Sequence, residues 1–145
     1  MIEIRIQTEA FDSAALLASL QTDGVGAISS FTGLVRSDDG VTAIELEHYP
    51  AMTEASLHAV AVEAQSRWNL SSAVIVHRVG KMAVGEPIVF VAAASAHRAE
   101  ALAACAFLID RLKTDAPFWK KEYRGEQSAW VEAKASDDAR AADWN

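Results

Sequence analysis

The stretch Pro87–Ala94, with the sequence PIVFVAAA, is one of the longest apolar runs in the chain and decides the fold. A continuous apolar run of this length is typical of a strand in the middle of a sheet, covered on both faces. Ser95 then caps a predicted helix that runs to about Lys113. The apolar stripe of this helix contains Leu102, Cys105, Ala106, Ile109 and Leu112. A buried strand followed by a long amphipathic helix predicts a layered domain with its own core.

Further strands and helices are predicted on the N-terminal side of this segment. The strands are expected at Ile2–Ile6, Ala27–Arg36, Val41–Tyr49 and Ala73–Val79. One helix is expected after an Asp12 N-cap, through Leu20, and another after a Thr53 N-cap, to about Trp68. The turn-forming residues Ser37-Asp38-Asp39-Gly40 separate the second and third strands, so we expect a hairpin there.

Beyond Lys113 the pattern of regular structure weakens. Pro117 prevents a simple continuation of the long helix, a short strand is predicted around Ala129–Ala133, and a polar tail covers residues 134–145. With 145 residues the chain has the size of one domain. Its mixture of elements, with two strands in succession, predicts an α+β domain with a largely antiparallel or mixed sheet.

Composition and charge argue against several classes of function. The net charge of −7, from 20 acidic and 13 basic residues, argues against general binding of nucleic acids. No apolar stretch reaches the roughly 18 to 20 residues of a membrane span, and the first residues do not resemble a signal peptide. The single cysteine, Cys105, excludes an internal disulfide and favours the cytoplasm. The four histidines lack metal-binding spacing, so we expect no metal site.

Basic side chains nevertheless gather on both sides of Pro117. Lys113, Lys120, Lys121 and Arg124 lie within twelve residues of an otherwise acidic chain, which indicates one anion-binding site rather than a basic surface. A desolvated lysine beside other cations has a lowered pKa and can act as a nucleophile or a base. The simpler interpretation of the same residues, taken alone, is a solvated basic loop.

Two other positions are candidates for anion binding. His97 and Arg98 stand at the predicted helix start, where free backbone N–H groups and the helix dipole attract anions. Arg36 ends a predicted strand just before the turn. Taken singly, a solvated helix end and an exposed arginine are the simpler interpretations. His48 and Cys105 are favoured as packed residues rather than as a ligand and a nucleophile.

Seven short segments form an ordered set of motifs. They are FTGLVR at Phe31–Arg36, LEHYPAM at Leu46–Met52, HRVG at His77–Gly80, GEPIVFV at Gly85–Val91, SAHR at Ser95–Arg98, LKTDAPFWKKE at Leu112–Glu122, and WVEA at Trp130–Ala133. In this order they resemble the large, catalytic subunit of molybdopterin synthase, over about residues 24–144. Each motif alone is weak, but the ordered set is highly specific, above all SAHR followed by LKTxAPFWKxE.

The resemblance implies a fold, partners and a reaction. The fold is an α/β-hammerhead with an additional antiparallel sheet, in a homodimer that binds a carrier subunit at each end to form a heterotetramer. The carrier is a small ubiquitin-like protein, and its C-terminal Gly-Gly tail, ending in a thiocarboxylate, inserts into a pocket of this chain. Sulfur passes to cyclic pyranopterin monophosphate, and two transfers build the dithiolene of molybdopterin. Neither a metal nor another cofactor is implied for this step.

The resemblance also implies roles for individual residues. Lys113 matches a lysine beside the terminal glycine of the carrier, and Lys120 matches a second catalytic lysine. The implied substrate-binding residues are Leu34, Val35, Arg36, His97, Arg98, Lys113, Lys120, Lys121 and Glu122. We therefore expect the helix start, the lysine cluster and the strand-end arginine to contact one anionic ligand. Lys134 stands where arginine is common in the family, and its role is open.

Two alternatives from other functional classes use the same residues. In the first, the pocket belongs to a non-catalytic regulatory module that binds a phosphate or a nucleotide. In the second, the chain is an interaction protein whose Phe118-Trp119 turn docks a partner. Formation of molybdopterin from a thiocarboxylated carrier would separate these two alternatives from the enzyme.

Overall fold

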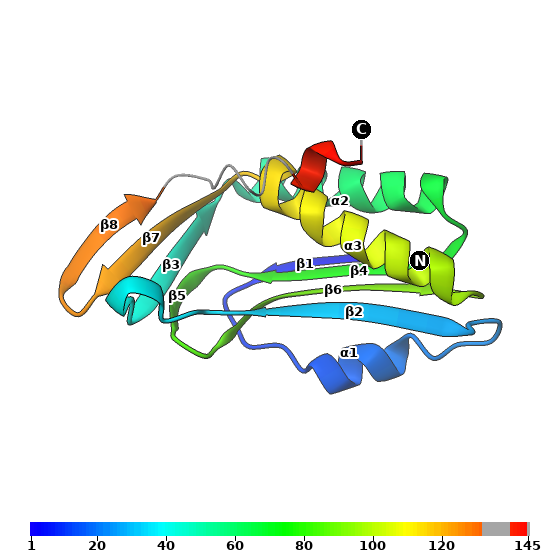
Figure 1. The fold of residues 1–145 in the computed structure, drawn as a ribbon, viewed down its shortest axis with the longest axis horizontal. Coiled ribbons are helices and arrows are strands. Elements are labelled where there is room, and N and C mark those ends of the chain that lie inside the picture. The colour runs from blue at the N-terminus through cyan, green and yellow to red at the C-terminus, as the bar shows by residue number, and fades with distance from the viewer. Residues whose placement is uncertain (132–139, 145) are drawn as a thin grey trace.

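A four-stranded sheet forms the centre of the computed structural model, which describes residues 1–131 and 140–144. Its strands are β1 (Ile2–Gln7), β4 (Leu70–Arg78), β6 (Pro87–Ser95) and β2 (Ala27–Leu34), in the order β1-β4-β6-β2 (Figure 1). β1 pairs with β4 in parallel, and the other neighbours are antiparallel. The residues from Val89 to Ala94 in β6 are buried between two neighbouring strands, which confirms the predicted central strand.

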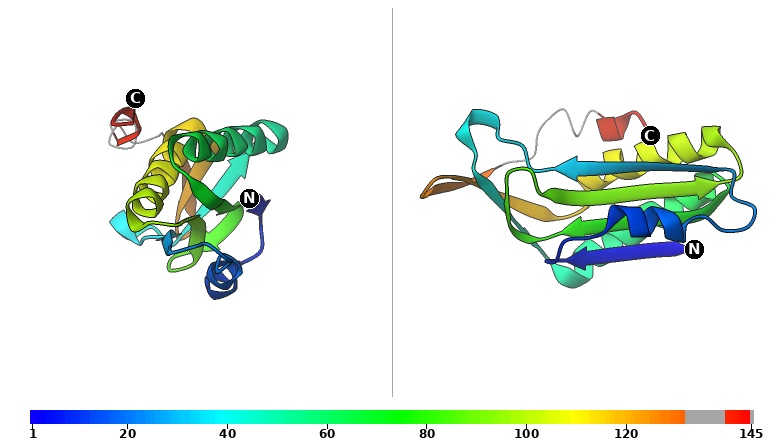
Figure 2. Two further views of the ribbon diagram at one scale, coloured as in Figure 1. Left: turned by 90° about the vertical axis from the view of Figure 1, so that its right-hand side faces the viewer. Right: turned by 90° about the horizontal axis from the view of Figure 1, so that it is seen from below.

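Helices cover both faces of this sheet (Figures 1 and 2). α2 (Pro50–Arg67) and α3 (Arg98–Asp115) pack on one face, and the short α1 (Ser13–Ser19) packs on the other. No helix in the described ranges is long and apolar enough to cross a membrane. The larger core lies between the sheet and the pair α2 and α3, and it includes the fully buried side chains of Leu57 and Phe107.

The buried face of α3 differs from the prediction at its first position. Leu102 was expected in the apolar stripe, but it is 60% exposed. The buried residues of this helix are Ala101, Ala104, Cys105, Phe107, Leu108 and Leu112. Of the predicted stripe, Cys105 and Leu112 are buried, and Ala106 and Ile109 are only partly buried. Burial raises the pKa of the Cys105 thiol, as expected for a packed cysteine.

A second four-stranded sheet, wholly antiparallel, extends from one end of the first (Figure 1). Its strands are β5 (Gly80–Ala83), β3 (Ala43–His48), β7 (Phe118–Arg124) and β8 (Gln127–Val131), in the order β5-β3-β7-β8. The two sheets confirm the α+β class and the additional antiparallel sheet. The sequence did not predict β7. Its charged residues fall on both faces of the strand, so the alternation of apolar and polar residues that indicates a strand is absent.

The predicted hairpin between β2 and β3 is wrong. β2 pairs with β6, whereas β3 pairs with β5 and β7 in the other sheet. After Leu34 the backbone stays beside the residues that precede β6: the Val35 N–H donates to the Glu86 carbonyl at 2.9 Å, and the Gly85 N–H donates to the Val35 carbonyl at 2.8 Å. These bonds prolong the contact between the two segments by one residue, and a short 3₁₀ turn, Asp38–Gly40, then leads the chain into the second sheet.

The start of α2 also differs from the prediction, whereas the start of α1 agrees with it. α2 begins at Pro50 with Tyr49 as its N-cap, because proline is favoured at the first helical position. Thr53 was expected to be the cap, but it lies inside the first turn and is fully buried. In α1 the Asp12 carboxylate accepts a hydrogen bond from the Ala15 N–H at 3.1 Å, as predicted for an N-cap.

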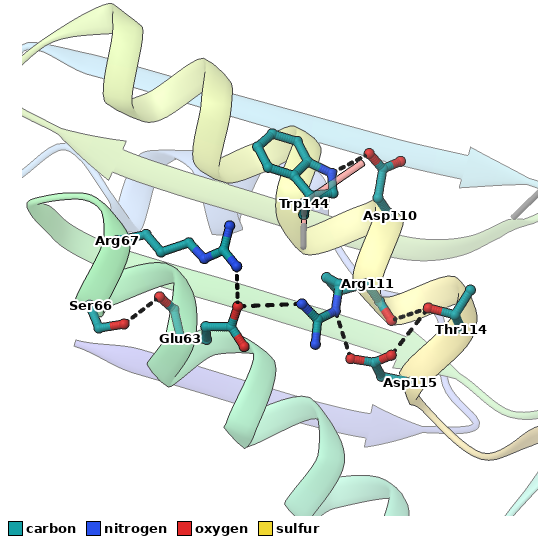
Figure 3. Close-up of polar contacts among 8 residues, drawn as sticks. All are labelled: Glu63, Ser66, Arg67, Asp110, Arg111, Thr114, Asp115 and Trp144. Atoms are coloured by element: carbon teal, nitrogen blue, oxygen red, sulfur yellow. Dashed lines mark hydrogen bonds and ion pairs between the residues drawn. The ribbon is translucent and has the colours of Figure 1, made fainter. Parts of the chain in front are cut away.

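The last described residues pack on the two long helices (Figure 3). The Trp144 Nε1–H donates to the Asp110 carboxylate at 2.7 Å, and the indole ring meets the rings of Trp68 and Phe107 edge-on. The end of the predicted polar tail therefore covers part of the hydrophobic core.

Candidate functional site

Lys113 and Lys120 lie on the two elements that meet at Pro117. Lys113 occupies the last turn of α3 and is exposed, while Lys120 lies near the start of β7 and is half-buried. The connection consists of Ala116 and Pro117, and the Phe118 N–H closes it by donating to the Ala116 carbonyl at 3.0 Å. The two lysines therefore stand on either side of one tight connection.

β7 presents its neighbouring lysines on opposite faces of the second sheet. Lys120 is paired with Leu46 of β3, so its side chain shares a face with buried Leu46 and with Glu122. Lys121 lies on the other face, where its ammonium nitrogen is 5.4 Å from the centre of the Trp130 ring. The structure thus separates Lys121 from Lys120, which the sequence placed in one cluster.

A buried histidine packs against the start of β7. The His77 ring of β4 stacks on the Phe118 ring, with centroids 4.0 Å apart and planes 19° apart. Its Nδ1 lies 2.8 Å from the Arg78 carbonyl oxygen, so this nitrogen carries the proton and donates. The pKa of His77 is lowered to about 4, chiefly by burial and also by the charges of Lys113 and His48. His77 is therefore neutral at pH 7, and Lys113 lies near the His77–Phe118 stack.

The lowered pKa of His77 predicts an acid-sensitive fold. Between pH 6.5 and about 4 the unfolded chain binds a proton at this histidine more readily than the folded chain does, so the free energy of unfolding falls as the pH decreases through this window. The full loss is about 3 to 4 kcal/mol, at about 1.4 kcal/mol per unit of pKa difference. Urea unfolding at several pH values measures it.

Two variants control this measurement. His77→Phe preserves an aromatic ring against Phe118 and removes the titrating group, so its stability is expected to depend less on pH within the window. His58→Gln removes an exposed histidine and is expected to leave the slope unchanged. Equal slopes for His77→Phe and the wild type would contradict the assignment.

Arg36 follows the end of β2 and is exposed to solvent. Its guanidinium forms an ion pair with Asp38 at 3.0 Å, and the two side chains are 69% and 63% exposed, so the pair is weak and easily exchanged. Leu34 is also exposed, whereas Val35 is buried. Because the Val35 N–H is already bonded to the Glu86 carbonyl, it is not available as a donor to a substrate.

His97 and Arg98 lie at the opposite end of α3 from Lys113 (Figure 1). Both are exposed, and His97 is the N-cap without a capping side-chain bond. Ser95, the predicted cap, ends β6 instead, and its hydroxyl donates to the Asn69 carbonyl at 2.7 Å. The helical rise between Arg98 and Lys113 amounts to roughly 22 Å. The expected single cluster of helix start and lysines is therefore not present within one chain.

Two arginines near the lysines are engaged in ion pairs within the chain. The Arg111 guanidinium binds the carboxylates of Asp115 at 2.8 Å and Glu63 at 3.3 Å, and so joins α3 to α2 (Figure 3). Arg124 donates to the Glu122 carboxylate at 3.2 Å. These contacts assign Arg111 a structural role.

An open pocket of about 290 Å³ lies on the second sheet, on the face opposite buried Leu46. Its lining residues are Glu47, His48, Tyr49, Trp119 and Trp130. The rings of Tyr49 and Trp119 meet edge-on, with centroids 4.6 Å apart. The sequence did not indicate this pocket, because only the pairing of β3, β7 and β8 brings its residues together. Neither Lys113 nor Lys120 lines it.

The chemistry available near Pro117 is that of positive charge and hydrogen-bond donors. Within residues 1–131 and 140–144, no group of three or more His, Cys, Asp or Glu side chains is arranged to hold a metal ion. Lys134 lies outside these residues. Lys113 and Lys120 beside Pro117, and Arg36 beyond the end of β2, carry charges that suit an anionic ligand.

Comparison with known proteins gives one consistent result. The family model described as MoaE protein matches residues 6–115. A molybdopterin synthase catalytic subunit from Mesorhizobium japonicum is 51% identical, over 97% of this chain and 92% of its own length. The structure of a molybdopterin biosynthesis MoaE protein from Burkholderia ambifaria superimposes with a TM-score of 0.87 at 47% identity, covering 99% of this chain and 98% of the other. A chain in a complex of subunits 1 and 2 of the molybdopterin-converting factor from Helicobacter pylori shares the fold, with a TM-score of 0.77 at 21% identity over 90% and 91% of the two chains.

Proposed function

The chain belongs to the MoaE family and is the catalytic subunit of molybdopterin synthase, a sulfurtransferase of molybdenum cofactor biosynthesis, and from this premise we propose how its residues act. The sulfur donor is the C-terminal thiocarboxylate of a small ubiquitin-like carrier subunit with a Gly-Gly tail. The acceptor is cyclic pyranopterin monophosphate. The observation that carries this proposal is the placement of Lys113 and Lys120 on either side of the Pro117 connection, with Lys120 half-buried.

The two lysines act on the carrier tail. Lys113 is exposed at the end of α3, where an incoming anionic tail can pair with its ammonium group. The thiocarboxylate sulfur attacks a side-chain carbon of the substrate, the carbon–oxygen bond at that carbon breaks with loss of the oxygen, and the tail is then held by a thioester. Water adds to its carbonyl, the carbon–sulfur bond breaks, and the carrier leaves as a carboxylate while the sulfur stays on the substrate. An ammonium group beside that carbonyl stabilises the oxyanion formed during the addition.

The substrate contacts require residues that one chain keeps apart. Arg36, Lys120 and Glu122 lie at the end of the molecule that contains the second sheet, whereas His97 and Arg98 lie roughly 22 Å from Lys113 along α3. A pterin phosphate is too small to span that distance. We propose a homodimer in which the α3 start of one chain meets the lysines of its partner, with a carrier at each end of the heterotetramer.

The homodimer has a direct test. Light scattering of the isolated chain at micromolar concentration is expected to give twice the 15.6 kDa mass of one chain. A subunit interface covers exposed apolar side chains such as Leu34 and Leu102, which are 53% and 60% exposed in the single chain. A strict monomer that forms molybdopterin at full rate would contradict the shared site.

The proposed reaction is tested by incubating the chain with a thiocarboxylated carrier and cyclic pyranopterin monophosphate and measuring molybdopterin. A regulatory module would bind the phosphate without forming product, and an interaction protein would bind its partner through the exposed Trp119 without binding the phosphate. We place the reaction in the cytoplasm, since the single, buried Cys105 is typical of a chain that needs no oxidising compartment.

A further inference from the structure

A buried threonine of α2 fixes the connection between the two lysines. The Thr53 hydroxyl donates to the Pro117 carbonyl oxygen at 3.1 Å, and Thr53 is 0% exposed. Thr53 is itself held in the first turn of α2, because its N–H donates to the Tyr49 carbonyl at 2.8 Å. The hydroxyl is held at a fully buried position, so its removal takes this donor from the Pro117 carbonyl and leaves no side-chain replacement at Thr53.

A second buried side chain holds the next residue of the connection. Phe118 stacks on His77, which belongs to β4 of the central sheet and is itself tied to the Arg78 carbonyl through Nδ1. Pro117 is thus fixed to a helix and Phe118 to a sheet. These two consecutive residues lie between Lys113 and Lys120.

We propose that Thr53 and His77 are positioning residues for sulfur transfer: by fixing Pro117 and Phe118 they set the relation of Lys113 to Lys120. This inference rests on the proposed function of the two lysines. Neither Thr53 nor His77 needs to touch the substrate, since each acts through the backbone of the connection. A displacement of about 1 Å at a reacting group can lower a rate about 100-fold, so a loosened connection affects catalysis before it affects folding.

Two substitutions at one position separate positioning from packing. Thr53→Val keeps the shape of the side chain and removes the hydroxyl, whereas Thr53→Ser keeps the hydroxyl and removes a methyl group. Both are expected to lower the thermal stability. Only Thr53→Val is expected to lower the single-turnover rate of sulfur transfer, by about tenfold or more, with carrier affinity unchanged. Equal rates for the two variants would overturn the proposal.

Thr42 offers a control near the far end of β7. Its hydroxyl donates to the carbonyl of Tyr123, in β7, at 3.3 Å, but at an exposed position. Thr42→Val makes the same chemical change away from Pro117 and is expected to transfer sulfur at the wild-type rate. If Thr53→Val does not fold, Phe118→Leu takes its place, because it removes the stacking on His77 and predicts the same loss of rate.

A second measurement reports how firmly the backbone of the connection is held, without relying on activity. Hydrogen exchange of the backbone amides in residues 116–121 is expected to be about tenfold faster in Thr53→Val than in Thr53→Ser, Thr42→Val or the wild type. A wild-type chain that transfers no sulfur would refute the proposed function, and exchange would still decide whether Thr53 holds the connection. Unchanged exchange in Thr53→Val would overturn the positioning role even if the enzyme is active.

Discussion

Replacing Lys113 with alanine is expected to lower the single-turnover rate of sulfur transfer by about 10²- to 10³-fold, the usual effect of removing one preorganised charge beside a developing oxyanion. The side chain is exposed in the last turn of α3, so its loss creates no cavity in the core. The variant is therefore expected to fold, to dimerise and to bind the carrier through the wider interface. Rate and carrier affinity are measured in parallel with thiocarboxylated carrier.

The conservative variant sharpens this test. Lys113→Arg is expected to restore little of the rate, because a planar guanidinium neither replaces a compact ammonium group nor loses its proton. If Lys113 only attracted the anionic tail, arginine would serve nearly as well, and the rate would recover. Full recovery in Lys113→Arg would therefore assign Lys113 to binding instead of catalysis.

Lys120 and Lys121 form a matched pair on one strand. Lys120→Ala is expected to be as slow as Lys113→Ala, with an added loss of substrate affinity, because its side chain lies on the partly buried face of β7. Lys121→Ala is expected to be milder, since Lys121 lies on the opposite face near Trp130. Near-normal turnover in both Lys113→Ala and Lys120→Ala would refute the mechanism and favour the binding module.

The elements of the central sheet could be predicted because their signals are local. The apolar run Pro87–Ala94 forms the central strand, and the alternating residues Ile2–Ile6 form an edge strand beside β4. Asp12 caps α1 because a carboxylate at that position accepts from the N–H three residues later. Each of these outcomes depends on neighbours within a few residues in the sequence.

The errors arose where distant residues decide the pairing. The segment Ser37–Gly40 connects two strands, but β2 pairs with β6 whereas β3 pairs with β5 and β7, so the connection joins two sheets instead of two paired strands. β7 was not predicted because the charged Lys120 and Glu122 share a face with the aromatic Phe118. Such a mixed face does not indicate a strand, and the segment forms one through its pairing with β3. No local pattern in these segments indicates which strand each of them pairs with.

The roles of Lys113 and Lys120 stay predictions from the ordered motifs. The structure adds that Lys113 lies in the last turn of α3 and Lys120 in β7. The separation of Arg98 from Lys113 was already contained in the length of the predicted helix, since its rise gives roughly 1.5 Å per residue. The role of Thr53 could not be predicted from the sequence. It depends on the start of α2 at Pro50 and on a hydrogen bond to a residue 64 positions away.

Arg98→Ala is expected to weaken binding of the substrate by about 10- to 100-fold, as for the loss of one charged hydrogen bond worth about 1.5 to 3 kcal/mol, while carrier affinity stays unchanged. Arg98 is exposed at the start of α3, where its guanidinium and the helix dipole both favour an anion. Equilibrium binding of the substrate to the isolated dimer measures the effect. Unchanged affinity would remove Arg98 from the site.

A mixed dimer of Arg98→Ala and Lys113→Ala chains tests where the site lies. If the α3 start of one chain completes the site of its partner, both homodimers are defective at each site. In the mixed dimer one site then carries both defects and the other carries none, so the mixture is expected to regain about half of the wild-type activity. If all residues of a site belonged to one chain, every site would keep one defect, and the mixed dimer would show only the average of the two homodimers. Chains with different affinity tags, purified in two steps, provide the mixed dimer, and activity at this average would refute the proposed shared site.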